Sequence, residues 1–167
     1  MEVRPLEARD RAWLAEVCRR HFAADQVAAL GRLHQPARLA GLVAWEGGRR
    51  AGGVSYCEEE GGAEVVLVVG DPPGRGAGSA LLRALEGLGR ARGWGRLRLV
   101  VTNDNTPALR FYQRRGWDLV ALHAGAADRD RLLKPEILAC GIDGIPIRHA
   151  LELQFALGPG ERSGRCR

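Results

Sequence analysis

The sequence predicts a single domain of the α/β (α+β) class, and three observations lead to this prediction. The 167 residues, 46% hydrophobic and 27% charged, suffice for one compact core. The uninterrupted apolar run at residues 65–69 is typical of a central strand that is buried on both faces. The glycine-rich segment 70–78 follows this strand directly and leads into an amphipathic pattern typical of a helix.

The first half of the chain contains one predicted helix and several strands. Residues 3–6 form a short predicted strand, and Asp10 is expected to cap the helix that follows. The apolar face of that helix consists of Trp13, Leu14, Val17, Cys18 and Phe22. Residues 24–40 have no clean period, so we expect a loop that forms one wall of a site. Apolar runs at 42–45 and 51–56 flank a glycine turn and predict a hairpin.

Two strand-and-helix units follow this hairpin. After the loop at 70–78, a helix with a leucine face is expected to end at Gly93. Apolar residues alternate with arginines at 96–101 and predict the next strand. Thr106 is expected to cap a further helix, which Gly116 ends.

The last part of the chain is less regular. Residues 117–122 and 151–157 have the apolar pattern of strands. Between them, residues 124–149 hold a short helical piece and a stretch rich in glycine and proline. We therefore expect residues 1–157 to form the folded domain and residues 158–167, rich in glycine and arginine, to form a flexible tail.

Composition and charge narrow the classes of function. No window approaches ~20 uninterrupted apolar residues and the first residues lack a signal-peptide pattern, so we expect a cytoplasmic protein without a membrane partner. The formal net charge is +5, from 24 arginines and a single lysine, Lys134, against 20 acidic residues. This excess of positive charge suits an anionic ligand. The chain lacks a nucleic-acid-binding motif that combines aromatic and basic residues, so we do not expect a nucleic-acid partner.

The cysteines and histidines are too dispersed for a zinc site. The four cysteines are Cys18, Cys57, Cys140 and Cys166, and the four histidines are His21, His34, His123 and His149. No spacing among them matches a metal-binding pattern. We therefore expect no metal, reduced thiols, and no ligand or base role for any of the histidines.

Glycines 74, 76 and 78 open a helix directly after the buried strand. Unhindered backbone amides and the positive end of a helix then face outward together, which favours a phosphate cradle. The segment contains no lysine, which a P-loop requires. It also does not match the dinucleotide-binding pattern G-x-G-x-x-G. The last position of that pattern is Ser79 when it starts at Gly74 and Leu81 when it starts at Gly76. A tight strand-to-helix turn without a ligand is the alternative interpretation.

Two motifs resemble the GNAT superfamily of acyl-CoA-dependent N-acetyltransferases. The family's cofactor loop, [Q/R]-x-x-G-x-[G/A] followed by a small residue and leucines, is similar to residues 73–82, Pro-Gly-Arg-Gly-Ala-Gly-Ser-Ala-Leu-Leu. The family's second signature, N-x-x-A-x-x-x-Y-x-x-x-G-[FWY], is met at Asn105, Ala108, Tyr112, Gly116 and Trp117. The resemblance is strong over residues 63–122. It departs at Pro73, which replaces the family's Gln or Arg and removes one side-chain contact and one N–H donor.

The resemblance implies a fold, a reaction and a coenzyme site. The fold would be a single GNAT-type domain whose central, twisted, mixed and mostly antiparallel sheet carries helices on both faces and splays between its two central strands. The reaction would transfer an acetyl group from acetyl-CoA to a primary amine by direct attack in a ternary complex. The implied coenzyme-binding positions are Val66, Leu67 and Val68 for the pantetheine arm, and Gly74, Arg75, Gly76, Ala77, Gly78 and Ser79 for the pyrophosphate.

The resemblance also implies roles for individual side chains. Tyr112 would contact the coenzyme and protonate its leaving thiolate, with core packing as the alternative. Asn105 would fix the pantetheine amides, with turn or cap chemistry as the alternative. Glu64 would act as the base for the acceptor amine, with a solvated charge at a strand end as the alternative. Candidates for the coenzyme phosphates are Arg75, Arg83 and Arg110.

The acceptor and the oligomeric state stay open at this point, and a homodimer is among the alternatives. Peptide amino termini, lysine side chains, polyamines and aminoglycosides all fit, because residues 24–40 and 123–149, the expected specificity walls, are the least patterned parts of the chain. A catalytically silent acyl-CoA-binding or regulatory module is the alternative to an enzyme. Turnover of acetyl-CoA with amines would separate the two.

Overall fold

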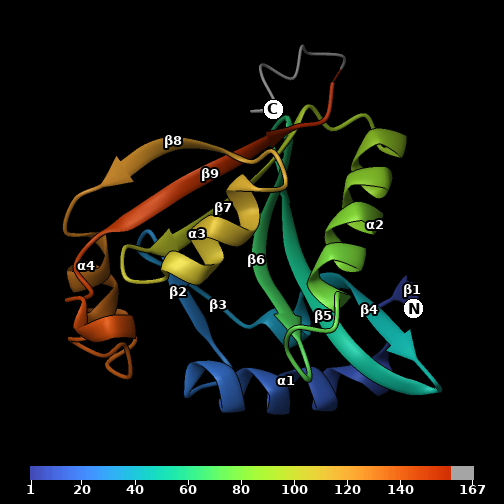
Figure 1. The fold of residues 1–167 in the computed structure, drawn as a ribbon, viewed down its shortest axis with the longest axis horizontal. Coiled ribbons are helices and arrows are strands. Elements are labelled where there is room, and N and C mark those ends of the chain that lie inside the picture. The colour runs from blue at the N-terminus through green and yellow to red at the C-terminus, as the bar shows by residue number, and fades with distance from the viewer. Residues whose placement is uncertain (159–167) are drawn as a thin grey trace.

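The computed structural model describes residues 1–158 and arranges them around one seven-stranded sheet with helices on both faces (Figure 1). The strands are β1 (Glu2–Pro5), β2 (Val27–Ala29), β3 (Arg32–His34), β4 (Ala40–Glu46), β5 (Arg49–Glu59), β6 (Gly62–Gly70), β7 (Arg96–Thr102), β8 (Asp118–His123) and β9 (Ala150–Ala156). The helices are α1 (Ala8–Phe22), α2 (Ala77–Ala91), α3 (Thr106–Gln113) and α4 (Ala126–Leu133), with short 3₁₀ helices η1 (Pro36–Arg38) and η2 (Ile142–Gly144). The predicted tail, apart from Gly158, lies outside the described residues.

The sheet runs in the order β1-β4-β5-β6-β7-β9-β8, and its neighbouring strands are antiparallel except for β6 and β7. These two central strands pair in parallel only through residues 62–64 and 96–98. Beyond that point β6 and β7 diverge, as Figure 1 shows. The predicted mixed, mostly antiparallel sheet with a splay between its central strands is therefore confirmed.

Helices cover both faces of this sheet. The core on the first face contains Leu81, Leu82 and Leu85 of α2, Tyr112 of α3, and Val54, Leu97, Leu99 and Leu153 of the sheet. The core on the second face joins Leu14, Val17 and Cys18 of α1 to Leu67 and Val69 of β6. Burial of apolar surface on both faces is the main stabilising contribution to this layered arrangement.

Two expectations about helix caps are wrong. Asp10 does not cap α1 but occupies its third position, where its carboxylate accepts the Glu7 backbone N–H at 3.0 Å, and Glu7 is the N-cap. Asn105 rather than Thr106 caps α3, since its side chain accepts the Ala108 N–H at 3.2 Å. Each helix starts earlier than predicted because a neighbouring residue completes the capping interaction.

The segment predicted as a loop at 24–40 is partly ordered into a second, two-stranded sheet. Strands β2 and β3 pair across the two-residue turn Leu30-Gly31, and η1 follows. Both turn residues have positive φ, 50° and 79°, as a type I′ hairpin turn requires. The hairpin was not predicted because strands of three residues are too short to show a period.

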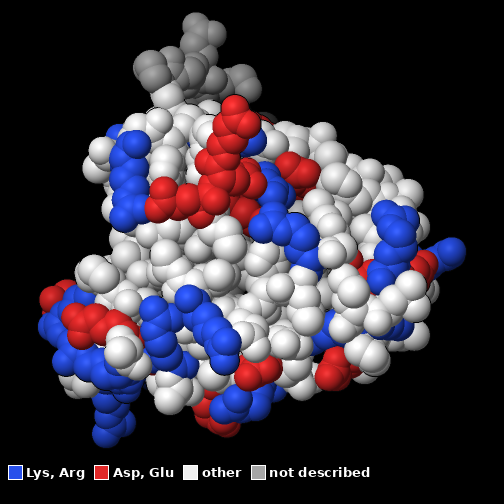
Figure 2. Space-filling model, turned by 180° about the vertical axis from the view of Figure 1, so that it is seen from behind, with Lys and Arg blue, Asp and Glu red and all other residues white. Residues whose placement is uncertain are grey.

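Charged side chains on the surface occur largely as pairs of opposite sign. Figure 2 shows that arginines on the face seen there lie among acidic side chains. Arg92, for example, pairs with Glu58, and Arg20 pairs with Asp71 at 2.6 Å. Within residues 1–158, no helix combines the length and the apolar character that a membrane span requires.

Candidate functional site

The loop after β6 ends in an uncapped helix start. Gly76 is the N-cap of α2 with φ 86° and no side-chain cap, and Ala80 donates the first intrahelical hydrogen bond to the Gly76 carbonyl at 3.0 Å. The N–H groups of residues 77–79 are therefore free of intrahelical partners at the positive end of the helix. This is the arrangement that a phosphate cradle requires, at the place where the sequence predicted one.

Two features hold the start of α2 against α3 and the residues that follow it. A Cβ on Gly78 would lie 3.2 Å from the ring of Phe111, so glycine lets the two helices approach closely. The Ser79 hydroxyl accepts hydrogen bonds from the Arg115 guanidinium, with the Nε–Oγ distance at 3.2 Å. The same guanidinium lies 3.6 Å from the centre of the Phe111 ring.

The predicted pantetheine-binding strand has a free edge. β5 pairs with one side of β6 along its length, whereas no described residue pairs with the β7-facing side beyond Glu64. A β-bulge at Val66 interrupts the β5–β6 register, where Ser55 faces Leu67 and Tyr56 faces Val65. Val66 and Val68 are half-buried rather than fully buried as predicted, and Val66 lines the cavity that the splay opens.

An open groove of about 1020 Å³ lies beside the cradle. Its lining consists of Ser79, Arg83, Thr106, Pro107, Arg110, Phe111, Arg114 and Arg115. Two of the three arginines predicted as phosphate ligands, Arg83 and Arg110, therefore meet in one place. Arg75 lies in the exposed loop, outside this lining, and Arg114 and Arg115 are two further basic side chains that the sequence did not single out.

Tyr112 belongs to the core, and only a small part of it reaches solvent. Its ring packs against Phe111 and Trp117, with centroid distances of 5.1 and 5.4 Å, and only 8% of the residue is exposed. Its hydroxyl has no hydrogen-bond partner within residues 1–158. Burial raises the pKa of the Tyr112 phenol, and the nearby Arg115 opposes this only in part.

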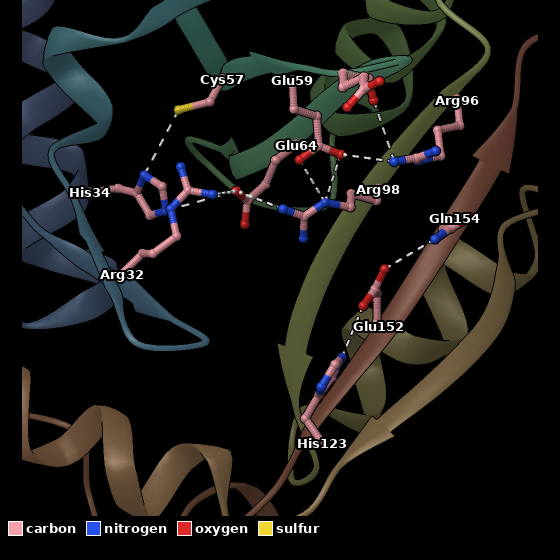
Figure 3. A network of polar contacts seen from close by, with 11 residues as sticks. Arg32, His34, Cys57, Glu59, Glu64, Arg96, Arg98, His123, Glu152 and Gln154 are labelled. Carbon is pink, nitrogen blue, oxygen red and sulfur yellow. Dashed lines mark hydrogen bonds and ion pairs between the residues drawn. The ribbon is translucent and has the colours of Figure 1, made fainter.

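Glu64 is buried at the point where the central strands part. It is 3% exposed, so its interpretation as a solvated charge is wrong. Its Oε2 accepts hydrogen bonds from Arg32 at 3.1 Å and Arg98 at 3.2 Å, and Arg98 also binds Glu59 at 2.7 Å. Figure 3 shows Glu64 between these two guanidinium groups. The second oxygen of Glu64, Oε1, is not used in these contacts.

Beside Glu64 the splay contains a cavity of about 50 Å³. Its walls are Val27, Ala28, Ala29 and His34 from the segment 24–40, Glu64, Val65 and Val66 from β6, Val100, Val101 and Thr102 from β7, and Ala127, Asp130, Ile137 and Ala150 from the last part of the chain. Both segments predicted as site walls therefore line one cavity, next to the free edge of β6.

The comparisons with known proteins agree with this geometry. Residues 5–117 match the family model for the acetyltransferase (GNAT) family. The chain belongs to the GNAT family. The uncharacterized protein YxbD of Bacillus subtilis (strain 168) is 33% identical to this GNAT chain over 129 residues, which are 77% of this chain and 74% of that protein.

Solved structures show the same fold at low sequence identity. The ribosomal-protein-S18-alanine N-acetyltransferase from Escherichia coli is 17% identical, with 99% of each chain covered and a TM-score of 0.69. A GNAT family acetyltransferase from Elizabethkingia anophelis, solved with acetyl-CoA bound, is 14% identical, with 93% of this chain and 97% of that chain covered and a TM-score of 0.65. These likenesses establish the GNAT fold of the chain.

The sequence interpretation missed two residues that line the cavity in the splay. His34, for which no role was expected, lines the cavity, is 6% exposed, and has an Nε2 atom that is buried without a hydrogen-bond partner. Asp130 accepts the backbone N–H groups of Leu30 at 3.0 Å and Gly31 at 2.6 Å. No sequence signal could have shown this, because α4 and the β2–β3 turn are about a hundred residues apart and meet only in the fold.

Proposed function

We propose that this GNAT domain transfers an acetyl group from acetyl-CoA to a primary amine. The observation that carries the proposal is the divergence of β6 from β7. It leaves a free strand edge between an uncapped helix start and a cavity that contains a buried carboxylate. Acetyl-CoA, when bound, supplies the acetyl group as a thioester, and the side chains around it bind, orient and exchange protons.

The residues present fit the coenzyme. The N–H groups at 77–79 bind the pyrophosphate, with Gly74 and Arg75 beside them, and the groove arginines Arg83 and Arg110 hold further phosphate charge. The free edge of β6 along Val66, Leu67 and Val68 holds the pantetheine arm as an added strand would be held. Pro73 adds no donor, but the helix amides do not depend on it.

Asn105 binds the coenzyme in this proposal through its side-chain NH2 group, which the helix cap leaves free. Its Oδ1 accepts the Ala108 N–H, so the capping interpretation holds for that oxygen. The Nδ2 group has no hydrogen-bond partner within residues 1–158 and donates to a pantetheine carbonyl in this proposal. Capping and coenzyme binding are therefore compatible roles for one side chain.

Two side chains transfer protons in the proposed mechanism. Glu64 takes the proton from the arriving ammonium group through Oε1, because Oε2 is held by two arginines. Tyr112, whose raised pKa keeps it protonated, donates its phenolic proton to the departing thiolate and regains one from the amide nitrogen that forms. A backbone N–H near Val68 stabilises the oxyanion.

The decisive experiment is a screen of primary amines with acetyl-CoA, followed by release of free thiol. The panel contains a peptide with a free amino terminus, a lysine-containing peptide, a polyamine and an aminoglycoside. Amine-dependent thiol release supports the proposal. Saturable binding of acetyl-CoA in calorimetry without thiol release from any amine would favour the silent acyl-CoA-binding module instead.

A further inference from the structure

The large sheet ends in a strand, β8, whose outer edge is free. Within residues 1–158 only β9 pairs with β8, and Figure 1 shows β8 as the outermost strand. Such an edge presents unpaired backbone N–H and C=O groups to another chain. The opposite edge strand, β1, is short and contains Glu2, Arg4 and Pro5, and these features discourage pairing. β8 contains no proline, lysine or arginine and lacks this protection.

Large apolar side chains are exposed along β8. Leu119 is 51% exposed, Val120 48% and Leu122 64%, so half of the six residues of this strand present apolar surface to solvent. Pairing with another strand would bury these side chains together with the unpaired backbone groups, and both changes favour association. The outer edge of β8 therefore has the properties of an interaction surface.

The two exposed leucines of β8 lie on one face of the sheet. Leu119 is the partner of Leu153 on β9, and Leu122 is the partner of Leu151. Directly paired residues share a face, and Leu153 belongs to the core that α2 and α3 cover. Val120 is the extra residue of a β-bulge, because β9 provides no partner for it. The bulge brings both leucines to the same face although they stand three positions apart in the sequence.

The other paired side chains of β8 lie on the opposite face. Asp118 and Ala121 are the partners of Gln154 and Glu152. His123 shares this face, and its Nε2 lies 2.9 Å from Oε2 of Glu152, as Figure 3 shows. Within residues 1–158, neither the Nδ1 atom of His123 nor the carboxylate of Asp118 has a hydrogen-bond or ion-pair partner. An acid and an ionisable base therefore stand at the two ends of one strand, on the same face.

We propose that β8 pairs in antiparallel fashion with β8 of a second copy of this chain. A two-fold axis passes beside Ala121, which faces its own copy. Leu119 then faces the partner subunit's Leu122, and Asp118 faces the partner subunit's His123. The seven-stranded sheets of the two copies join into one continuous sheet. This pairing is independent of the proposed acetyl transfer.

The distribution of side chains over the two faces selects this register. Every pair in it joins side chains on the same face, as an antiparallel pairing requires. A shift by one position would place Leu119 opposite Ala121, which lies on the other face. A shift by two positions keeps the faces but leaves one leucine of each chain uncovered. Only the proposed register covers all four leucines.

Charge and size are also complementary in this register. An imidazole of His123 with a proton on each nitrogen donates to Glu152 and to the partner subunit's Asp118. The same contact occurs twice, once on each side of the axis, and a mismatched register would lose both. Ala121 is the smallest side chain of β8, so the strands approach without a clash where each residue meets its own copy. A strand that fits itself in faces, charge and size identifies a second copy of the chain as its occupant.

Sedimentation velocity of the full-length protein, under reducing conditions and at concentrations up to about 100 μM, tests the pairing. We expect a dimer for the wild type. Leu119→Glu and Leu122→Lys should each raise the dimer dissociation constant by about 10-fold or more, because each places a charge opposite an apolar side chain. Leu132→Lys is the matched control, since Leu132 is 84% exposed on α4, and it should leave the dissociation constant unchanged.

Mixing of variants tests the register. A mixture of Leu119→Glu with Leu122→Lys places opposite charges face to face, so it should form a heterodimer at least about 10-fold tighter than either variant alone. A mixture of Leu119→Glu with Leu119→Lys places each charge opposite a leucine and should not regain the affinity. A wild-type monomer at about 100 μM, a dimer insensitive to both leucine substitutions, or equal recovery in the two mixtures would overturn the inference. The proposed transferase activity is measured separately, by thiol release.

Discussion

Replacing Tyr112 by phenylalanine separates its proposed chemistry from its packing. The ring lies in the core between Phe111 and Trp117, and phenylalanine keeps that ring. The hydroxyl has no hydrogen-bond partner within residues 1–158, so its removal leaves no buried group unpaired. We therefore expect the free energy of unfolding to change by less than about 1 kcal/mol. The turnover number should fall by about 10²-fold or more, which is the size of a typical general-acid contribution.

Tyr56 offers a matched control for this substitution. It is 4% exposed, its ring packs edge-on against Trp94 at 5.5 Å, and it belongs to the same core cluster as Tyr112. Burial raises the pKa of the Tyr56 phenol as well. Tyr56→Phe should therefore match Tyr112→Phe in chemical denaturation and in acetyl-CoA affinity, and leave turnover unchanged.

The pH dependence follows from the direction of the shift at Tyr112. A raised pKa means that the phenol keeps its proton at pH values where a free tyrosine, with a pKa of ~10, would lose it. Wild-type turnover should therefore show no loss from Tyr112 as the pH rises to about 10. Turnover of Tyr112→Phe within a factor of two of wild type, measured by thiol release, would refute the role and leave Tyr112 as a packing residue.

Four further predictions concern the proposed phosphate-binding loop, the proposed general base Glu64, the β2–β3 turn and the cysteine thiols. Gly76→Asp should lower acetyl-CoA affinity in calorimetry by about 10-fold or more, whereas Gly76→Asn, which adds a side chain of similar shape without charge at the same positive φ, should retain most of it. Glu64→Gln should lower turnover mainly below the pKa of the acceptor amine and leave coenzyme affinity unchanged; an unchanged pH–rate profile would exclude Glu64 as the base. Leu30→Asn should raise the free energy of unfolding by about 1 kcal/mol, because Leu30 has φ 50° in a turn that favours Asn-Gly, and a loss of stability in urea would contradict the strain argument. Burial raises the pKa of the Cys18 thiol to about 11, so iodoacetamide at pH 8 should label the exposed Cys140 and leave Cys18 unmodified in mass spectra of the folded protein.

The parts of the fold that were predictable are those with a strong local pattern. The apolar run at 65–69 identified the central strand, because a strand covered by helices on both faces needs few polar residues. The glycine spacing located the start of α2, because positive φ and close helix packing select glycine at Gly76 and Gly78. Local patterns of this kind predict structure without knowledge of the tertiary fold.

The parts that were not predictable depend on contacts between distant segments. His34 stands thirty positions before Glu64 in the sequence and meets it only because the β2–β3 hairpin folds over the splay. Asp130 shows no motif, yet both of its oxygens hold the Leu30-Gly31 turn. The burial of Glu64 likewise depends on Arg32 and Arg98, which neutralise a charge that would otherwise favour solvent.

The central claim is that the splay between β6 and β7 is a site of acetyl transfer to a primary amine. The most direct measurement mixes the full-length protein with acetyl-CoA labelled with ¹³C in its acetyl group and with n-propylamine, and identifies the products by mass spectrometry. The account predicts labelled N-propylacetamide and one equivalent of free CoA, formed about 10²-fold more slowly by Tyr112→Phe and at the wild-type rate by Tyr56→Phe. Bound acetyl-CoA that stays intact with propylamine and with every amine of the screening panel would contradict it.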